Sequence, residues 1–187
     1  MIRLARLALL FLAAVAALAA TGCGNKEATV HLADTEGIYV SVDELKYQIQ
    51  ISRILNPTSP EDQAYLRGVP AGEELEGDEV WYGIFMRVEN DTDKPHEMAS
   101  QMTISDTQGN TFEPIQLDPA LGDFGYQATE LGPGSLYPPL DTPASDNTIR
   151  GGLVLFKVDT QSLYNRPLVL TIESPSGGEN AEIDIDV

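Results

Sequence analysis

Cysteine is almost absent from this chain: Cys23 is the only one among 187 residues. A disulfide within one chain is therefore excluded, and the fold must depend on its hydrophobic core. Histidine is nearly as scarce, and His31 and His96 lie far apart in the sequence. Serine and cysteine hydrolases need a base beside the nucleophile. With so few histidines and no Gly-x-Ser-x-Gly motif, the sequence presents no assembled catalytic set of that kind.

Basic residues are also few. The chain has 11 lysines and arginines against 29 aspartates and glutamates, and its formal net charge is −18. Two of the basic residues, Arg3 and Arg6, lie ahead of Cys23 in a stretch without acidic residues. The part that follows Cys23 thus carries nine basic and 29 acidic residues, a net charge of −20. Such a surface repels nucleic-acid phosphates and anionic lipid headgroups, and we expect no nucleic-acid partner.

A long apolar run is missing as well. Residues 7–20 are apolar, but as a helix they would rise only about 21 Å, short of the roughly 30 Å hydrocarbon core of a bilayer. Basic residues before this run and small residues after it are typical of a secretory signal peptide. Because Cys23 directly follows Thr21 and Gly22, the segment resembles a bacterial lipoprotein signal.

This resemblance implies a lipid anchor. Residues 1–22 would be a cleaved lipoprotein signal peptide, and Cys23 would be lipidated on its sulfur and become the new N-terminus. Two or more acyl chains would hold the protein stably on the extracytoplasmic face of the cell membrane, since one chain is marginal. Residues 23–37 would then be the lipidated N-terminus and a linker. An ordinary secreted protein is the alternative, although a free thiol is unfavourable in an oxidising compartment.

Alternation of apolar and polar residues recurs through residues 38–187 and predicts half-buried strands. Residues 45–51 alternate strictly, whereas residues 80–89 are almost continuously apolar, as a central strand covered on both faces would be. Further strands are predicted at residues 38–42, 101–105, 111–113, 152–158, 168–173 and 181–187. Short strands without a βαβ rhythm predict an all-β fold, an immunoglobulin-like antiparallel β-sandwich that forms one domain over residues 38–187.

Turn and helix signals are local. Residues 106–110 predict a hairpin turn in which Gly109 takes a positive φ. One short helix is predicted in a loop: Ser59 can cap it, Pro60 suits its first position, and Gly68 would end it after residue 67. The sequence also allows a helical turn near residues 160–164.

The order of these segments resembles a known family. The segments are residues 45–50 (LKYQIQ), 55–57 (LNP), 80–90, 104–112 (ISDTQGNTF) and 152–158 (GLVLFKV). They are similar to actinobacterial lipoproteins with a telokin-like, immunoglobulin-like extracellular domain of unknown function. The resemblance covers about residues 38–187 and implies this fold and an extracellular location. It brings no catalytic residues with it.

Two patterns could bind metal. On an extended strand His96, Met98 and Met102 would share one face, and imidazole and thioether ligands suit Cu(I). The same spacing would also place Met98 and Met102 on one face as ordinary core residues, without any metal. Acidic turns at residues 91–93 and 106–110 offer oxygens to Ca²⁺, but neither has the ligand spacing of an EF-hand. Packing and turn formation account for both patterns, so we predict no cofactor and assign no metal ligand.

Loops on a rigid sandwich commonly carry binding. Residues 118–148 form a long loop region rich in proline and tyrosine, which could either contact a partner or close one end of the core. Trp81, Tyr82 and Phe85 share one predicted strand and are expected in the core. The candidate residues for a partner-binding loop are Tyr126, Leu136, Tyr137, Pro138 and Pro139.

The sequence thus predicts a lipid-anchored extracellular module of the bacterial cell envelope. It would have a binding or structural role without catalysis, and a protein or an envelope component as its partner. The alternative is an extracytoplasmic lipoprotein that binds a metal, calcium or copper, or a solute. An envelope hydrolase, or an inhibitor of one, comes third.

Overall fold

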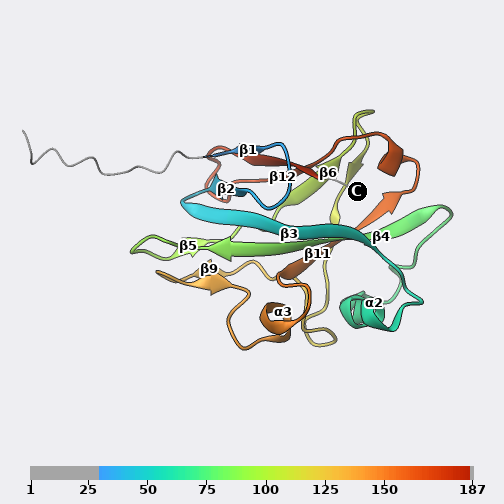
Figure 1. Ribbon diagram of the computed structural model, residues 1–187, viewed down its shortest axis with the longest axis horizontal. Helices are drawn as coiled ribbons and strands as arrows, with labels where there is room; N and C mark the ends of the chain where they lie inside the picture. Colours follow the sequence, from blue (N-terminus) through green and yellow to red (C-terminus); the bar gives the residue numbers. More distant parts are fainter. Residues whose placement is uncertain (1–29, 186–187) are drawn as a thin grey trace, which may run out of the picture.

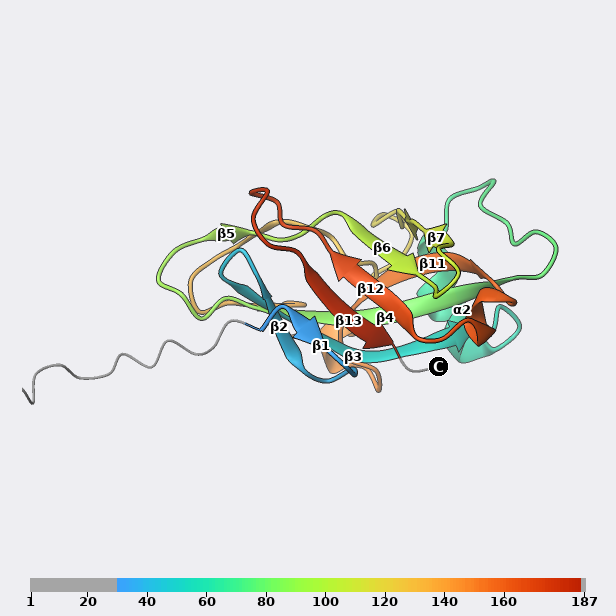
Figure 2. The same cartoon turned by 90° about the horizontal axis from the view of Figure 1, so that it is seen from above.

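The computed structural model describes residues 30–185 and arranges them as two packed β-sheets with short helices beneath the second sheet (Figure 1). Figure 2 shows the first sheet in front, with β12 and β13 crossing over β3 and β4. The predictions for the signal peptide at residues 1–22, for Cys23, and for residues 24–29, 186 and 187 lie outside the described residues. The all-β prediction and the sandwich are confirmed.

Each sheet joins strands that are distant in sequence. The first has the order β1 (Leu32–Ala33), β13 (Ala181–Ile185), β12 (Leu168–Ile172), β6 (Met102–Ser105) and β7 (Thr111–Phe112). The second has the order β2 (Tyr39–Val42), β3 (Leu45–Leu55), β4 (Glu79–Glu89), β11 (Gly152–Asp159) and β8 (Pro114–Ile115), and β10 (Leu136–Tyr137) also pairs with β4. A separate pair joins β5 (His96–Glu97) and β9 (Glu130–Leu131).

Strand β4 explains why residues 80–89 are almost continuously apolar. Tyr82, Ile84 and Met86 belong to the core between the two sheets. Trp81 and Phe85 alternate with them and belong to a second core on the outer face of the second sheet. Burial of each such large side chain contributes roughly 1.5–3 kcal/mol. The prediction of a central strand covered on both faces is confirmed, and so is the core position of its aromatic residues.

The second core is covered by α2 (Pro60–Tyr65) and the 3₁₀-helix Leu66–Gly68, which occupy the predicted helical segment. Ser59 occupies the N-cap position, although its side chain makes no capping hydrogen bond. The buried Asp62 carboxylate instead accepts hydrogen bonds from the backbone N–H of Asn56 at 2.8 Å and from Arg53 of β3. This contact ties the helix to the second sheet.

Four features differ from the predictions. A second helix, α3 (Pro143–Asp146), begins after Thr142 in the proline-rich loop, where proline at the first turn favours it. The pairing of β1 with β13 is parallel, so the sandwich is not wholly antiparallel. A bulge between Ile49 and Ile51 shifts the alternation of β3. As a result, Ser52 is buried and Ile51 is exposed.

The fourth difference concerns the start of the domain. The sequence placed residues 23–37 in a lipidated N-terminus and linker, yet residues 30–37 belong to the sandwich. The carbonyl of Val30 accepts the N–H of Ser41 at 2.7 Å, and the carbonyl of His31 accepts the N–H of Glu182 at 2.8 Å. Ala33 is buried in the main core. The folded domain therefore begins before residue 38, and a linker after Cys23 has at most residues 24–29.

Candidate functional site

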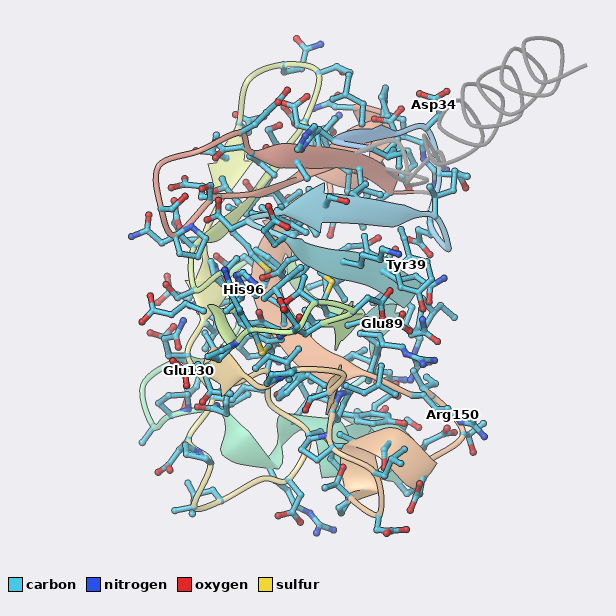
Figure 3. All side chains as sticks on the ribbon, turned by 90° about the vertical axis from the view of Figure 1, so that its left-hand side faces the viewer. Asp34, Tyr39, Glu89, His96, Glu130 and Arg150 are labelled. Atoms are coloured by element: carbon cyan, nitrogen blue, oxygen red, sulfur yellow. The ribbon has the colours of Figure 1, made fainter. Side chains whose placement is uncertain are left out.

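A groove with a volume of about 1190 Å³ lies at the end of the sandwich where the described chain begins. Its walls come from five parts of the chain: residues 30–31, strand β2 with the turn into β3, the end of β4, the turn between β4 and β5, and the turn between β12 and β13. Figure 3 looks onto this end and labels Tyr39, Glu89 and His96. No single segment of the sequence contains the groove.

The groove is strongly acidic. Its lining includes five carboxylates, one lysine and two histidines. The lysine, Lys46, is 3.0 Å from the Asp91 carboxylate and neutralises one of the acids. With neutral histidines the lining therefore has a net charge of −4. A concave surface with charge of one sign attracts ligands of the opposite sign, here cations.

The two outer turns of the groove are joined by hydrogen bonds. Asp43 lies in the turn between β2 and β3, and its carboxylate accepts bonds from the hydroxyl of Ser174 at 2.7 Å and from the N–H and hydroxyl of Ser176 at 2.9 and 2.6 Å. Asp43 and Glu44 both have positive φ, 47° and 69°, which is unfavourable for residues with a side chain. Bonds from a turn on another strand pair hold this conformation.

These contacts also set the charge of Asp43. Burial by itself raises the pKa of the Asp43 carboxyl, but the hydrogen bonds from Ser176 and Ser174 outweigh it and hold the pKa below its usual value. His96, on the other side of the groove, adds a small lowering. Asp43 is therefore an ionised part of the groove at neutral pH.

A second wall is held by Glu89 at the end of β4. The hydroxyl of Tyr39 donates to Glu89 at 2.5 Å, and the guanidinium of Arg87 is 2.9 Å from the same oxygen. Burial, together with the hydrogen bond to Glu89, raises the pKa of Tyr39 to about 12. Tyr39 therefore stays a neutral donor at physiological pH, and the charge of Glu89 is shared with Arg87.

The groove brings together the two histidines that are distant in sequence. His31 Nε2 is 3.3 Å from Glu179, and His96 Nε2 is 3.0 Å from the hydroxyl of Thr92. The Ser176 hydroxyl donates to Asp43 rather than to a histidine ring. In the described contacts, neither histidine is therefore placed to activate this serine as the base of a hydrolase would.

Sequence reasoning did not find this groove. It identified His31 and His96 as separate residues and residues 91–93 as a turn. The signal that was available is the acidic turn at Asp43-Glu44 and the uncharged, serine- and glycine-rich turn at residues 174–178. Their association depends on the contact between β2 of the second sheet and β13 of the first, which no local pattern encodes.

Two of the five residues of the predicted partner-binding loop contact the main core, Tyr137 as a member and Tyr126 packed against it. Tyr137 is buried, and its hydroxyl donates to the carbonyl of Gly125 at 3.1 Å and accepts from the N–H of Gln127 at 2.8 Å. The Tyr126 hydroxyl donates to the carbonyl of Ala99 at 2.8 Å, and its ring packs edge-on against Tyr137 with centroids 5.3 Å apart. These two tyrosines close one end of the core, which is the second of the two alternatives that the sequence left open for residues 118–148.

The rest of that loop is divided between interior and surface. Pro138 is buried, Leu136 is half-buried and Pro139 is exposed. Leu136, Tyr137 and Pro138 line one side of a small hollow, which is therefore the part of the predicted loop still available to a ligand.

The metal-binding patterns are not assembled. Met98 and Met102 are 3% and 2% exposed and belong to the main core, whereas His96 lines the groove. The Asp106 carboxylate accepts four amide N–H bonds, two from Asn110 and one each from Gln108 and Asn165, at 2.8–2.9 Å, so its oxygens are occupied by donors. Within residues 30–185, no three or more histidine, cysteine or acidic side chains are grouped to hold a metal ion.

Comparisons with known proteins concern the fold. No family model matches the chain, and no curated protein is similar to it in sequence. The structure is similar to yjhA of Bacillus subtilis, with 8% identity and a TM-score of 0.47 over 82% of this chain and 99% of that one. It is also similar to the putative lipoprotein ycdA of Bacillus subtilis, with 13% identity and a TM-score of 0.49 over 79% of this chain and 38% of that one.

A third similar structure is an uncharacterized β-sandwich protein of Clostridium difficile, with 11% identity and a TM-score of 0.45 over 82% of this chain and 95% of that one. As for membrane spans, none of the helices in residues 30–185 has the length and apolar composition to cross a bilayer.

Proposed function

We propose that this protein is a lipid-anchored, non-catalytic binding module on the extracytoplasmic face of the cell membrane, and that its acidic groove binds a cationic segment of a partner. The observation that carries the proposal is the groove itself, a cavity of about 1190 Å³ lined by five carboxylates against one lysine. The lipoprotein resemblance at Cys23 supports the anchor, and the β-sandwich, a rigid framework whose loops can carry binding residues, supports a role in binding.

The position of the groove supports its use near the membrane. Val30, the first described residue, lines the groove. Six residues separate it from Cys23, and a fully extended chain covers at most about 3.6 Å per residue. An anchor at Cys23 would therefore keep the groove within about 25 Å of the lipidated cysteine. The net charge of −20 would hold the domain away from anionic headgroups and leave the groove open.

The groove can be tested with a cationic probe and a matched pair of variants. Hexalysine binding to the full protein, purified from membranes in a neutral detergent, is measured by calorimetry at two salt concentrations. Both variants lose three exposed acids that no described contact requires for folding, and only the first set lines the groove. The groove variant combines Glu44→Gln, Asp91→Asn and Glu179→Gln, and the control variant combines Glu74→Gln, Glu113→Gln and Asp123→Asn.

We expect the groove variant to bind hexalysine about tenfold more weakly, since each exposed ion pair contributes about 0.2–1 kcal/mol. The control variant should change the affinity less than about threefold, although it removes the same charge. Higher salt should weaken binding to the unmodified protein because it screens exposed charges. An equal loss in both variants would mean that only the net charge attracts the probe. Turnover of glycan, peptide or ester substrates would contradict the non-catalytic part.

A further inference from the structure

A second concavity lies beside β4, where β10 pairs with the end of that strand beyond β11. Its volume is about 180 Å³, below the roughly 300–1,000 Å³ of sites that enclose a whole small-molecule ligand. Leu136, Tyr137, Pro138 and Leu140 supply apolar groups, and the Leu140 side chain is 73% exposed. The hollow has room for one side chain and leaves an apolar rim open to solvent.

Two arginines line the same hollow, Arg87 and Arg150. Arg87 is paired with Glu89 through one terminal nitrogen at 2.9 Å, and its guanidinium has further N–H groups. Arg150 is exposed and makes no hydrogen bond or ion pair with any residue between 30 and 185. The hollow therefore combines apolar walls with a guanidinium that has no protein partner in the described part of the chain.

The backbone beside Arg150 is held close to β4. Gly151 has a φ of 130°, and a Cβ there would lie 2.9 Å from the backbone of Phe85 and Met86. The N–H of Gly151 donates to the carbonyl of Ala144 in α3 at 2.9 Å. Only glycine fits this position, so Arg150 extends from a segment that is packed on the sheet and bonded to the helix.

We propose that this hollow binds the C-terminal residue of a peptide chain. The apolar side chain of that residue would lie against Leu136, Pro138 and Leu140, and its free carboxylate would pair with Arg150, assisted by Arg87. The planar guanidinium matches a carboxylate through two parallel hydrogen bonds. A polyanion such as nucleic acid or an anionic bilayer would be repelled by the net charge of −20, whereas a single carboxylate on an apolar group experiences mainly the local arginines.

The test uses two peptides that differ in one group, acetyl-Ala-Ala-Leu with a free carboxylate and the same peptide as an amide. Each is titrated into the full ¹⁵N-labelled protein in neutral detergent and followed by NMR. We expect saturable shifts at the amides of Leu136, Leu140 and Gly151, and an affinity at least about tenfold higher for the acid, since only the acid can accept charge-assisted hydrogen bonds from the guanidinium.

Arg150→Gln should remove that preference for the acid. Arg67→Gln is the matched control, because Arg67 is also exposed, makes no described side-chain contact and lies outside the hollow. Leu140→Ser should weaken both peptides about threefold or more, since it removes exposed apolar surface without disturbing the core. The amide spectrum of each variant verifies that it is folded.

Three results would overturn the proposal: no saturable shift at the hollow with either peptide, equal affinity for acid and amide, or the same effect from Arg150→Gln and Arg67→Gln. Selective binding of phosphatidylglycerol vesicles through Arg150, without peptide binding, would also overturn it in favour of a membrane contact. The groove variant should bind the peptide acid normally, so this proposal and the proposed function can fail independently.

Discussion

Ser176 donates its hydroxyl to the carboxylate of Asp43 at 2.6 Å, although the two residues are 133 positions apart in the chain. The bond joins the turn between β2 and β3 to the turn between β12 and β13, and so it connects the two sheets at the groove. It also accompanies a positive φ at Asp43, a conformation that persists only where the surroundings enforce it. The shape of the groove depends on this contact.

Replacing Asp43 should therefore loosen the domain. Asp43→Ala removes three hydrogen bonds to a charged acceptor, and we expect a loss of about 1–3 kcal/mol in the free energy of unfolding. Urea denaturation measures the loss. Asp91→Asn is the control, because Asp91 is an exposed groove carboxylate whose ion pair with Lys46 should contribute at most about 1 kcal/mol. Equal losses in the two variants would show that Asp43 does not hold the turns together.

Asp106 should make stability depend on pH. Burial by itself raises the pKa of its carboxyl, but hydrogen bonds from Asn165 and Asn110 outweigh it and lower the pKa far below the usual value. A lowered pKa in the folded state stabilises the protein above the unfolded value of about 3.9, and this contribution is lost as the pH falls further. Urea midpoints from pH 7 to pH 2 should thus decline below about pH 4.

Asp106→Asn should be less stable at pH 7 by about 2 kcal/mol and should show a smaller decline in acid, because the group that titrates is gone. Glu113→Gln, an exposed acid elsewhere, should retain the decline of the unmodified protein. If the urea midpoint of Asp106→Asn fell in acid as steeply as that of the unmodified protein, the pH dependence would come from other carboxylates.

Tyr137 of the predicted loop should contribute to the stability of the folded domain. Tyr137→Phe removes the hydroxyl that bonds Gly125 and Gln127, and it leaves a partly buried carbonyl and N–H without this partner. We expect a loss of about 1–3 kcal/mol in thermal or urea unfolding. Pro139→Ala, at the exposed neighbouring position, should cost less than about 0.5 kcal/mol. A stability unchanged by Tyr137→Phe would argue against its role in closing the core.

The ion pair between Arg53 and Asp62 should be costly to break. Asp62 is 4% exposed, and Arg53 Nε is buried without a hydrogen-bond partner in the described chain. Asp62→Ala would leave the guanidinium without its carboxylate, and we expect a loss of about 2–3 kcal/mol, less than for a fully buried pair because Arg53 is partly exposed. Glu61→Ala, at the exposed neighbouring position of α2, is the control and should change urea unfolding little.

The lipid anchor is tested at Cys23. Cys23→Ser should release the protein from the membrane fraction, because the acyl chains have no other attachment. Mass spectrometry of the unmodified protein should find an N-terminal peptide that begins at Cys23 and carries acyl chains. The single substitution Glu74→Gln should leave the protein in the membrane fraction. An uncleaved leader, or a mature chain that begins elsewhere without lipid, would contradict the anchor.

Several elements could be predicted from local pattern. Alternation indicated most of the longer strands, and the continuous apolar run indicated that β4 is covered on two faces. The helix after Ser59 and the turn around Gly109, with its φ of 86°, follow from residue types at fixed positions. These elements depend on contacts within a few residues, so their signal is present in the sequence itself.

Other elements have no such signal. Strand β1 has two residues, too few for an alternation, and the bulge in β3 reverses the face of Ser52 without any glycine to mark it. Tyr137 lies in a proline-rich segment that is typical of a surface loop, but the pairing of β10 with β4 places it in the main core. The absence of a side chain at Gly152 leaves room for its ring. Arg87 and Arg150 are likewise 63 positions apart, and they line the same hollow because β11, which follows Arg150, pairs with β4, which contains Arg87.

The sequence by itself determined the acidic charge, the absence of a disulfide, the all-β sandwich and the expectation of a lipid anchor, because composition and periodicity need no partner. The tertiary structure alone decided that both histidines share one groove, that Asp43 joins two turns across the sheets, and that two arginines meet beside an apolar hollow. Such sites arise from the register between distant strands, which depends on packing of the whole core.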